Sequence, residues 1–508
     1  MNYAERVGKG TFMIFTLTML AAAIGYGFRI FLSRSLSIDD YGLFYSVIAV
    51  VATLGVFREF GLATSLVKHM AELKARADYS GIKSATLMVF AVQLVLTLIV
   101  FAPVAFFADA LAESYFGTPA ASAVLLLVLL EGIINMGLYS AVFQGMQKFN
   151  VFAFVELARV SLVLLFSYFF VSEGAAGIAK AQLLSTVAMN AIFVGLALRA
   201  MPFLMKERFV FNRELFAKIL KFGFTLWLGN IIVMVVSRMD VLTITYFRPL
   251  SEVALYNASL PTAMLLMTFA SALNNTIYPT ISELWARKET AAISRGMTSV
   301  IRLFFIMMVP FVLLLVFHSN AILSTLFGNK FAPATLSLQI LSIAMLFAAI
   351  SQIFFGAING MGRPGTNTKI YSVTAIAVFI MDIAFVPLYG MDGASLATAV
   401  SYFMMFIMAL LFLRGKVNIM VSAGDYMRII GGGISFVLAA KVVSDSIFGR
   451  TGNLFLEAAV SAAVASMAYV IVILASKAVK KADLDILIAS GIPIPNRFVR
   501  TLRHFISE

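Results

Sequence analysis

The chain of 508 residues is 61% hydrophobic and only 12% charged, with a formal net charge of +13. Because ordinary globular proteins are roughly half apolar and a quarter charged, this composition excludes a water-soluble enzyme and requires lipid around much of the surface. The chain has no cysteine and three scattered histidines, His69, His318 and His504, so we expect neither disulfides nor a metal site. The basic residues lie in short gaps between apolar runs, so we expect no nucleic-acid partner.

Fourteen apolar runs of about 20 residues or more follow one another along the chain. Each is long enough to cross the roughly 30 Å of hydrocarbon in a bilayer as an α-helix. The runs lie near residues 11–32, 43–66, 85–107, 121–145, 151–172, 175–198, 222–246, 253–280, 300–326, 334–358, 370–389, 393–413, 429–448 and 454–476. They predict an all-α polytopic membrane protein with 14 transmembrane helices. The first run has 22 residues and exceeds the core of a signal peptide, so we expect it to remain as a span.

The positions of lysine and arginine predict which loops face the cytoplasm. If the N-terminus lies inside, 28 of the 38 basic residues fall in inner segments or towards the inner end of a run, five in outer segments or towards the outer end of a run, and five elsewhere within the runs. Segment 199–221 alone holds six of the inner ones, and Arg302 is another. Because positive charge is enriched in cytoplasmic loops, this bias predicts that both termini are cytoplasmic.

Short polar sequences in the first half of the chain recur in the second half at nearly constant spacing. The matched segments are 71–78 (AELKARAD) with 282–289 (SELWARKE), 144–148 (QGMQK) with 359–363 (NGMGR), and Gly174–Gly177 with Gly390–Gly393. They predict a duplicated six-helix unit, whose two copies enter the membrane in the same sense because six is even. In transporters built from parallel repeats, the interface between the two lobes is the natural substrate path.

The duplication predicts two pseudo-symmetric six-helix lobes followed by two extra helices. The expected parts are an N-lobe over 1–200 (helices 1–6), a cytoplasmic linker over 201–221, a C-lobe over 222–416 (helices 7–12), helices 13 and 14 within 417–476, and a basic cytoplasmic tail over 477–508. The largest outer gap, near 108–120, is too short for a folded domain. Any function must therefore lie within the helix bundle or at its rims.

Several loop sequences resemble those of prokaryotic polysaccharide flippases. The segments are 29–44 (RIFLSRSLSIDDYGLF), 61–68 (GLATSLVK), 238–244 (RMDVLTI) with 250–256 (LSEVALY), and 359–364 (NGMGRP). Together with the helix count they are similar to the polysaccharide transporter branch of the multidrug/oligosaccharidyl-lipid/polysaccharide exporter superfamily, the Wzx-type flippases. Two positions depart from the pattern: Leu36-Ser37 stands where Leu-Gly is frequent, and Ala254 where glycine is frequent.

The resemblance implies a transporter and not an enzyme. Such a protein translocates a polyprenyl-pyrophosphate-linked oligosaccharide from the cytoplasmic to the outer leaflet by alternating access of two lobes around a central cavity. It also implies a monomer in the cell membrane of a prokaryote, with membrane lipids and glycan-assembly proteins as further partners. No cofactor is expected beyond coupling to H⁺ or Na⁺. The alternatives are a lipid II flippase, a drug/cation antiporter of the same superfamily, and a membrane glycan polymerase or ligase, which would need a larger outer loop.

Ionisable residues inside the runs are the candidate site. A charge in mid-membrane costs about 2.5–3.5 kcal/mol even on a lenient scale, so each one retained calls for a function. Because related flippases line their cavity with helices 1, 2, 7 and 8, the predicted substrate-binding residues are Arg29, Arg58, Arg238 and Asp240. The planar arginine fork suits the oxygens of a pyrophosphate. The alternative is that these arginines extend to the rim or neutralise neighbouring acids.

Carboxylates within the runs are candidates for ion coupling. The predicted residues are Glu131, Asp240 and Asp382, since a carboxyl group in the membrane can carry a proton or, when charged, bind Na⁺. Glu156 and Arg159 are three residues apart and favour a local ion pair instead. The sequence holds no G-x-x-x-x-G-K-[ST] run, so no ATP site of that kind is expected.

Overall fold

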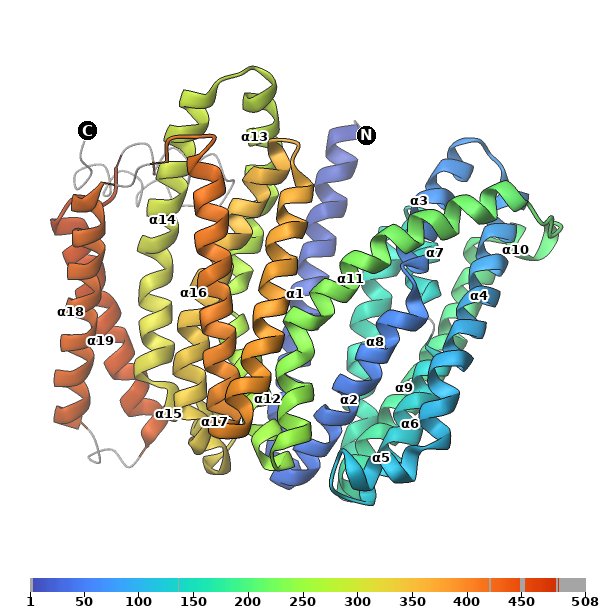
Figure 1. Cartoon of the computed structure of the whole chain (residues 1–508), viewed down its shortest axis with the longest axis horizontal. Coiled ribbons are helices and arrows are strands. Elements are labelled where there is room, and N and C mark those ends of the chain that lie inside the picture. The colour runs from blue at the N-terminus through green and yellow to red at the C-terminus, as the bar shows by residue number, and fades with distance from the viewer. Residues whose placement is uncertain (1–2, 136, 420–421, 448–452, 481–482, 484–508) are drawn as a thin grey trace. The chain divides into compact units, whose positions relative to one another are not determined.

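The structure is a computed structural model, and it describes residues 3–135, 137–419, 422–447, 453–480 and 483 (Figure 1). All regular elements named among these residues are helices, which confirms the predicted all-α polytopic membrane fold. The described residues of the fourteen predicted runs lie mostly in helices, and nine helical stretches among the described residues are long and apolar enough to span a membrane. The count of fourteen spans and the lobe boundaries stay predictions. By packing, the chain divides into two units, Met1–Ala254 and Leu255–Glu508.

The first unit is built from the helices up to α11, and α12 begins within it. The helices are α1 (Tyr3–Ser35), α2 (Ile38–Glu59), α3 (Leu62–Ala75), α4 (Tyr79–Phe106), α5 (Ala108–Ser114), α6 (Ala120–Ile134), α7 (Leu138–Gly145), α8 (Phe149–Phe170), η1 (Val171–Glu173), α9 (Gly174–Ala200), α10 (Phe203–Lys206), α11 (Arg213–Phe247) and α12 (Leu250–Met264). The long helix α11 packs along α2 and α3 (Figure 1).

The second unit contains the remaining helices. They are α13 (Met267–Ala286), α14 (Thr290–Phe317), α15 (Ser319–Leu326), η2 (Asn329–Ala334), α16 (Thr335–Gly360), α17 (Pro364–Arg414), α18 (Ala423–Ile447) and α19 (Leu454–Ala475). The long α17 is two helices joined at Gly390, whose left-handed backbone (φ 58°) breaks the helical path. This agrees with the separate runs predicted at 370–389 and 393–413.

Four of the predicted runs are interrupted helices and not continuous ones. The run at 43–66 breaks between α2 and α3, the run at 121–145 between α6 and α7, the run at 253–280 between α12 and α13, and the run at 300–326 between α14 and α15. At the first break, Phe60 and Gly61 both have left-handed backbone, with φ of 46° and 67°. A Cβ atom at Gly61 would overlap the carbonyl oxygen of Gly223 on α11, so only glycine allows this approach of the two backbones.

The matched segments of the two halves form the same backbone turns. In each matched pair the equivalent residue has positive φ. The pairs are Ala77 (55°) with Lys288 (61°), Gln147 (58°) with Gly362 (73°), and Gly174 (67°) with Gly390 (58°). Left-handed backbone is uncommon for residues other than glycine, so its recurrence at aligned alanine, glutamine and lysine positions supports the duplication.

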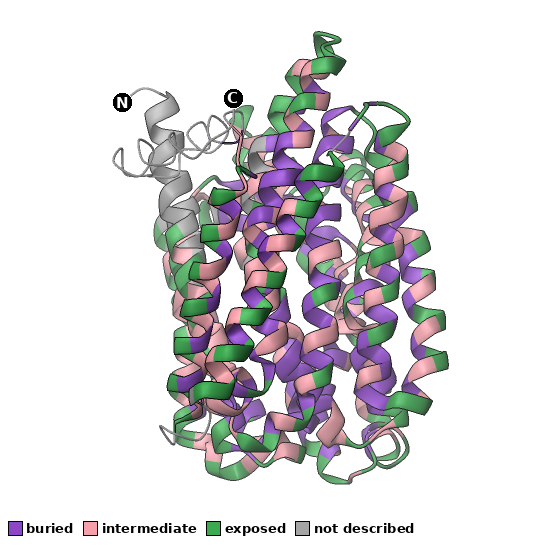
Figure 2. Ribbon diagram, turned by 90° about the vertical axis from the view of Figure 1, so that its left-hand side faces the viewer, coloured by how far each residue is buried: buried purple, intermediate pink, exposed green. Residues whose placement is uncertain are grey.

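Burial differs strongly among the helices of the second unit. In the span that ends with α16, 72% of the residues are buried, against 22% for α18 and α19, so α16 is the core helix and the last two are peripheral. Exposed turns alternate with buried ones along many of the helices (Figure 2). Large apolar side chains among the exposed residues include Leu388, Val442 and Ile471. In a membrane protein such side chains face lipid, where their exposure carries no hydrophobic cost.

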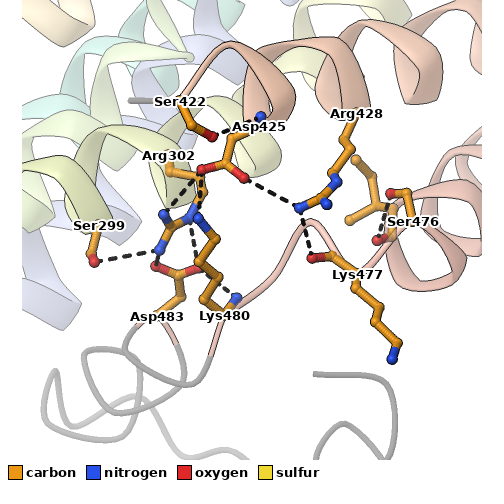
Figure 3. Close-up of polar contacts among 10 residues, drawn as sticks. Ser299, Arg302, Ser422, Asp425, Arg428, Ser476, Lys477, Lys480 and Asp483 are labelled. Carbon is orange, nitrogen blue, oxygen red and sulfur yellow. Dashed lines mark hydrogen bonds and ion pairs between the residues drawn. The ribbon is translucent and has the colours of Figure 1, made fainter. Parts of the chain in front are cut away.

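A buried ionic network joins α14, α18 and the segment that follows α19 (Figure 3). The Asp483 carboxylate accepts two hydrogen bonds from the Arg302 guanidinium, at 3.0 Å from Nε and 2.6 Å from Nη2. Asp425 on α18 lies 3.4 Å from Arg302 Nη1 and 2.7 Å from Lys480 Nζ. The side chains of Arg302, Asp425 and Asp483 are 4%, 2% and 0% exposed, so these charges depend on one another for solvation. The rest of the predicted tail, 484–508, lies outside the described residues.

An apolar cleft of about 210 Å³ separates α14 and α15 from α19 in the second unit. His318, which follows α14, lines it together with apolar residues such as Leu314, Leu326 and Phe455. The imidazole is buried, and its Nε2 atom makes no hydrogen bond within the described part of the chain.

Candidate binding cavity in the first unit

A polar cavity of about 500 Å³ lies within the first unit. It is lined by residues of α2, α4, α6, α8, α9 and α11, and its volume is in the range of small-molecule sites. Its polar lining residues are Arg58, Glu59, Glu131, Asn135, Arg159, Gln182, Asn230, Ser237 and Arg238. Three arginines against two glutamates leave a formal charge of +1 inside helices that span the membrane. The site therefore favours an anionic ligand with several hydrogen-bond acceptors.

Arg58 is held by the end of a neighbouring helix. It lies in the last turn of α2, and its guanidinium donates to the carbonyl oxygens of Gly132 at 2.5 Å and Asn135 at 2.9 Å. The guanidinium carbon also lies 5.4 Å from the centre of the Phe101 ring. Only 9% of Arg58 is exposed, so its side chain forms part of the cavity wall and projects little into the open space.

Glu131 is fixed on the same wall. Its Oε1 atom accepts hydrogen bonds from Asn135 Nδ2 at 3.0 Å and from Thr186 Oγ1 at 2.8 Å. The Arg58 guanidinium is within electrostatic range of both Glu131 and Glu59. The carboxylate thus links α6 to α9 while it still lines the cavity.

Arg238 is the cation that is open to the cavity. It lies on α11, is half-buried, and makes no hydrogen bond or ion pair within the described residues. The nearest interacting charge is another cation, Arg29 on α1, so the two guanidinium groups repel each other and reinforce the local positive potential. Arg29 is not a lining residue: its guanidinium carbon stacks 4.5 Å from the centre of the Tyr45 ring.

The structure brings together three of the six predicted site residues. Arg58, Glu131 and Arg238 line one cavity, and Arg29 lies within electrostatic range of it. Asp240 is buried on α11 and is not a lining residue. Asp382 is buried on α17, in the second unit.

Six other polar residues of the cavity were not predicted as site residues: Glu59, Asn135, Arg159, Gln182, Asn230 and Ser237. Arg159 was assigned to a local pair with Glu156, yet it lines the cavity. The Glu156 side chain lies outside the described residues. Gln182 and Asn230 also line the cavity, and their signal was available as uncharged polar residues inside the runs at 175–198 and 222–246. Uncharged polar side chains inside apolar runs are therefore candidate site residues as well as charged ones, because burial in lipid also penalises an amide.

Comparison with known proteins relates the amino-acid sequence to a family. Residues 7–285 match the family described as polysaccharide biosynthesis protein. An uncharacterized membrane protein of Methanocaldococcus jannaschii is 29% identical over 464 residues, which cover 88% of this chain and 92% of that protein. A probable low-salt glycan biosynthesis flippase of Haloferax volcanii is 20% identical over 396 residues, 78% of this chain and 81% of that flippase.

A solved structure shares the fold. A lipid II flippase in an inward closed conformation superposes with a TM-score of 0.73 at 14% sequence identity, covering 91% of this chain and 98% of the flippase. At this identity the likeness concerns the fold alone. The family match, in contrast, extends over more than half of the 508 residues. The chain therefore belongs to the polysaccharide biosynthesis protein family.

Proposed function

We propose that this protein is a flippase for a polyprenyl-pyrophosphate-linked oligosaccharide, which it moves from the cytoplasmic to the outer leaflet by alternating access. In this proposal it acts as a transporter and not as an enzyme, in a prokaryotic cell membrane, with both termini in the cytoplasm. The observation that carries the proposal is the cationic cavity in the first unit, where Arg238 is open to a ligand and Arg29 adds positive potential. A pyrophosphate group is multiply charged and rich in acceptors, which matches this lining.

The cavity chemistry argues against one alternative. A drug/cation antiporter needs acidic or aromatic groups for an organic cation, whereas arginines outnumber glutamates here. A lipid II flippase would need the same pyrophosphate site, so the two differ in the attached sugars. This alternative is therefore an outcome of the test below.

The proposal is tested with purified protein in liposomes that contain one fluorescent lipid at a time. The three lipids are a polyprenyl-pyrophosphate oligosaccharide, lipid II, and a neutral glycolipid without phosphate. Loss of fluorescence to a membrane-impermeant quencher measures flipping. We expect the first lipid to flip fastest and the neutral one not to flip above protein-free liposomes. Preferential flipping of lipid II would assign the alternative, and equal rates for all three would refute a headgroup-specific flippase.

Ion coupling through Glu131 is part of the same proposal. Glutamine at this position can still accept the hydrogen bonds from Asn135 and Thr186, so Glu131→Gln should fold, but it can neither carry a proton nor bind Na⁺ through a charge. If one proton is coupled per cycle, each pH unit across the membrane is worth about tenfold in transbilayer accumulation. We expect Glu131→Gln to abolish this response to an imposed pH or sodium gradient.

A matched variant separates charge from packing. Thr186→Val removes one hydrogen bond to the carboxylate but keeps the carboxylate itself, so gradient-driven flipping should persist. Asp240→Asn and Asp382→Asn belong in the same assay, because both are predicted coupling residues. If all three carboxylate variants respond to the gradients like the wild type, the proposed coupling residues are wrong.

A further inference from the structure

We infer that Arg58 is a positioning residue that holds the interrupted helix α6–α7, while the ligand's charge is met by Arg238. This inference rests on the proposed function and assigns different roles to two arginines of the cavity, Arg58 and Arg238. It starts from the break between Ile134, where α6 ends, and Leu138, where α7 begins. The break falls inside an apolar run predicted to cross the membrane, at 121–145.

A helix that stops within the membrane leaves carbonyl oxygens without their usual partners. In lipid no water replaces those partners, so each unsatisfied carbonyl carries a cost of several kcal/mol. Here three carbonyls at the end of α6 accept side-chain hydrogen bonds. Gly132 and Asn135 accept from Arg58, and Ile134 accepts from Asn190 Nδ2 at 3.1 Å.

The position of the Arg58 charge strengthens this role. The C-terminal end of a helix carries a partial negative charge, so a guanidinium at the end of α6 is favourably placed. Gly132 lets the Phe101 ring approach closely, and that ring also lies under the Arg58 guanidinium. Residues from α2, α4 and α9 thus converge on one break, where the donor to the Gly132 and Asn135 carbonyls is charged and the donor to the Ile134 carbonyl is a neutral amide.

The same contacts limit what Arg58 can offer to a ligand. Two of the five guanidinium N–H groups donate to backbone carbonyls, one from each terminal nitrogen, and the Nε atom is buried. These hydrogen bonds fix the orientation of the guanidinium against α6, so a ligand would have to accept the remaining N–H groups in that orientation. Arg238 donates no hydrogen bond to a backbone carbonyl within the described residues. The two arginines should therefore fail in different ways when they are replaced.

Kinetics in liposomes distinguish the two roles. For Arg58→Gln we expect the maximal rate of flipping of a fluorescent polyprenyl-pyrophosphate oligosaccharide to fall about tenfold or more, because charge-assisted hydrogen bonds are lost. The half-saturating lipid concentration should stay within about threefold, since Arg238 remains. Arg58→Lys keeps one charged donor and should recover part of the rate. Arg238→Gln should raise the half-saturating concentration about tenfold or more.

Hydrogen exchange reports on the helix break itself. We expect Arg58→Gln to speed amide exchange in residues 130–145 by about 10- to 150-fold, and Arg238→Gln to leave that exchange unchanged. Asn190→Ala is the matched uncharged control: it removes the third carbonyl contact and should also speed exchange there, with less effect than Arg58→Gln. If Arg58→Gln does not fold, Arg58→Lys and Asn190→Ala still provide both readouts.

Each outcome assigns a role. Unchanged exchange in 130–145 together with a raised half-saturating concentration for Arg58→Gln would make Arg58 a ligand contact and overturn the inference. Faster exchange together with a normal flipping rate would overturn it too, because Arg58 would then hold the helix break without contributing to transport. If Arg238→Gln binds and flips the lipid normally, the proposed headgroup site fails, while the exchange data still decide whether Arg58 holds α6–α7.

Discussion

Replacing Arg302 with methionine is expected to lower the free energy of unfolding by about 3–5 kcal/mol, because it leaves the buried carboxylate of Asp483 without its bidentate partner. For a unit of this size the loss corresponds to a fall in melting temperature of roughly 6–20 °C. The intrinsic fluorescence of Trp227 and Trp285 follows unfolding of the purified protein in detergent.

The chain contains its own control for this prediction. Arg287 and Glu283 are also joined at 2.6 Å, but both side chains are 63% exposed, so Arg287→Gln should cost less than about 1 kcal/mol. The double variant Arg302→Met with Asp483→Leu should recover most of the stability, since an apolar pair can replace a buried ion pair. Equal effects of Arg302→Met and Arg287→Gln would show that burial of the network adds nothing.

Arg238 is expected to have the largest effect on transport. Arg238→Ala removes both the charge and the planar fork, and Arg238→Lys keeps only the charge. Each charge-assisted hydrogen bond to the pyrophosphate is worth about 1.5–3 kcal/mol, which corresponds to roughly 10- to 150-fold in transport efficiency. If the contact is bidentate, Lys should also be damaging; if Arg238 acts only through the cavity potential, Lys should be tolerated and Ala should not.

Complementation of glycan export in cells that lack their own flippase measures this effect, with expression checked for each variant. Arg29→Ala and Arg58→Ala complete the set of predicted substrate-binding arginines. Arg34→Ala serves as the control, because Arg34 lies in the last turn of α1 and was not predicted as a site residue. Full activity of the alanine variants at positions 29, 58 and 238 would leave the fold intact but remove the proposed pyrophosphate site.

Helix positions were largely predictable because membrane spans depend on run length and composition. The helix breaks were not, since lipid allows an interrupted run to keep its apolar composition throughout. Residues Val56 to Leu62 show no proline and one glycine, Gly61, and the break there depends on the contact with Gly223, more than 150 residues later. Such a contact is set by tertiary packing and leaves no local signal.

The candidate site was predictable in part for a similar reason. A charge inside an apolar run is visible in the sequence, so Arg58, Glu131 and Arg238 were found. Their roles depend on partners that sequence spacing does not reveal, such as the Gly132 and Asn135 carbonyls. Arg302 illustrates the opposite error: it was counted among loop charges that set the topology, yet it is buried against Asp425 and Asp483.

The buried network also has a consequence for biosynthesis. Arg302 and Asp483 are 181 residues apart, so at about 5–20 residues per second a ribosome makes the carboxylate roughly 9–36 s after the guanidinium. During that interval α14 carries an arginine whose bidentate partner does not yet exist. A chain that terminates early, before position 483, never supplies it. A chain that ends between Asp425 and Asp483 therefore keeps the 3.4 Å contact between Arg302 and Asp425 but lacks the bidentate partner of the guanidinium.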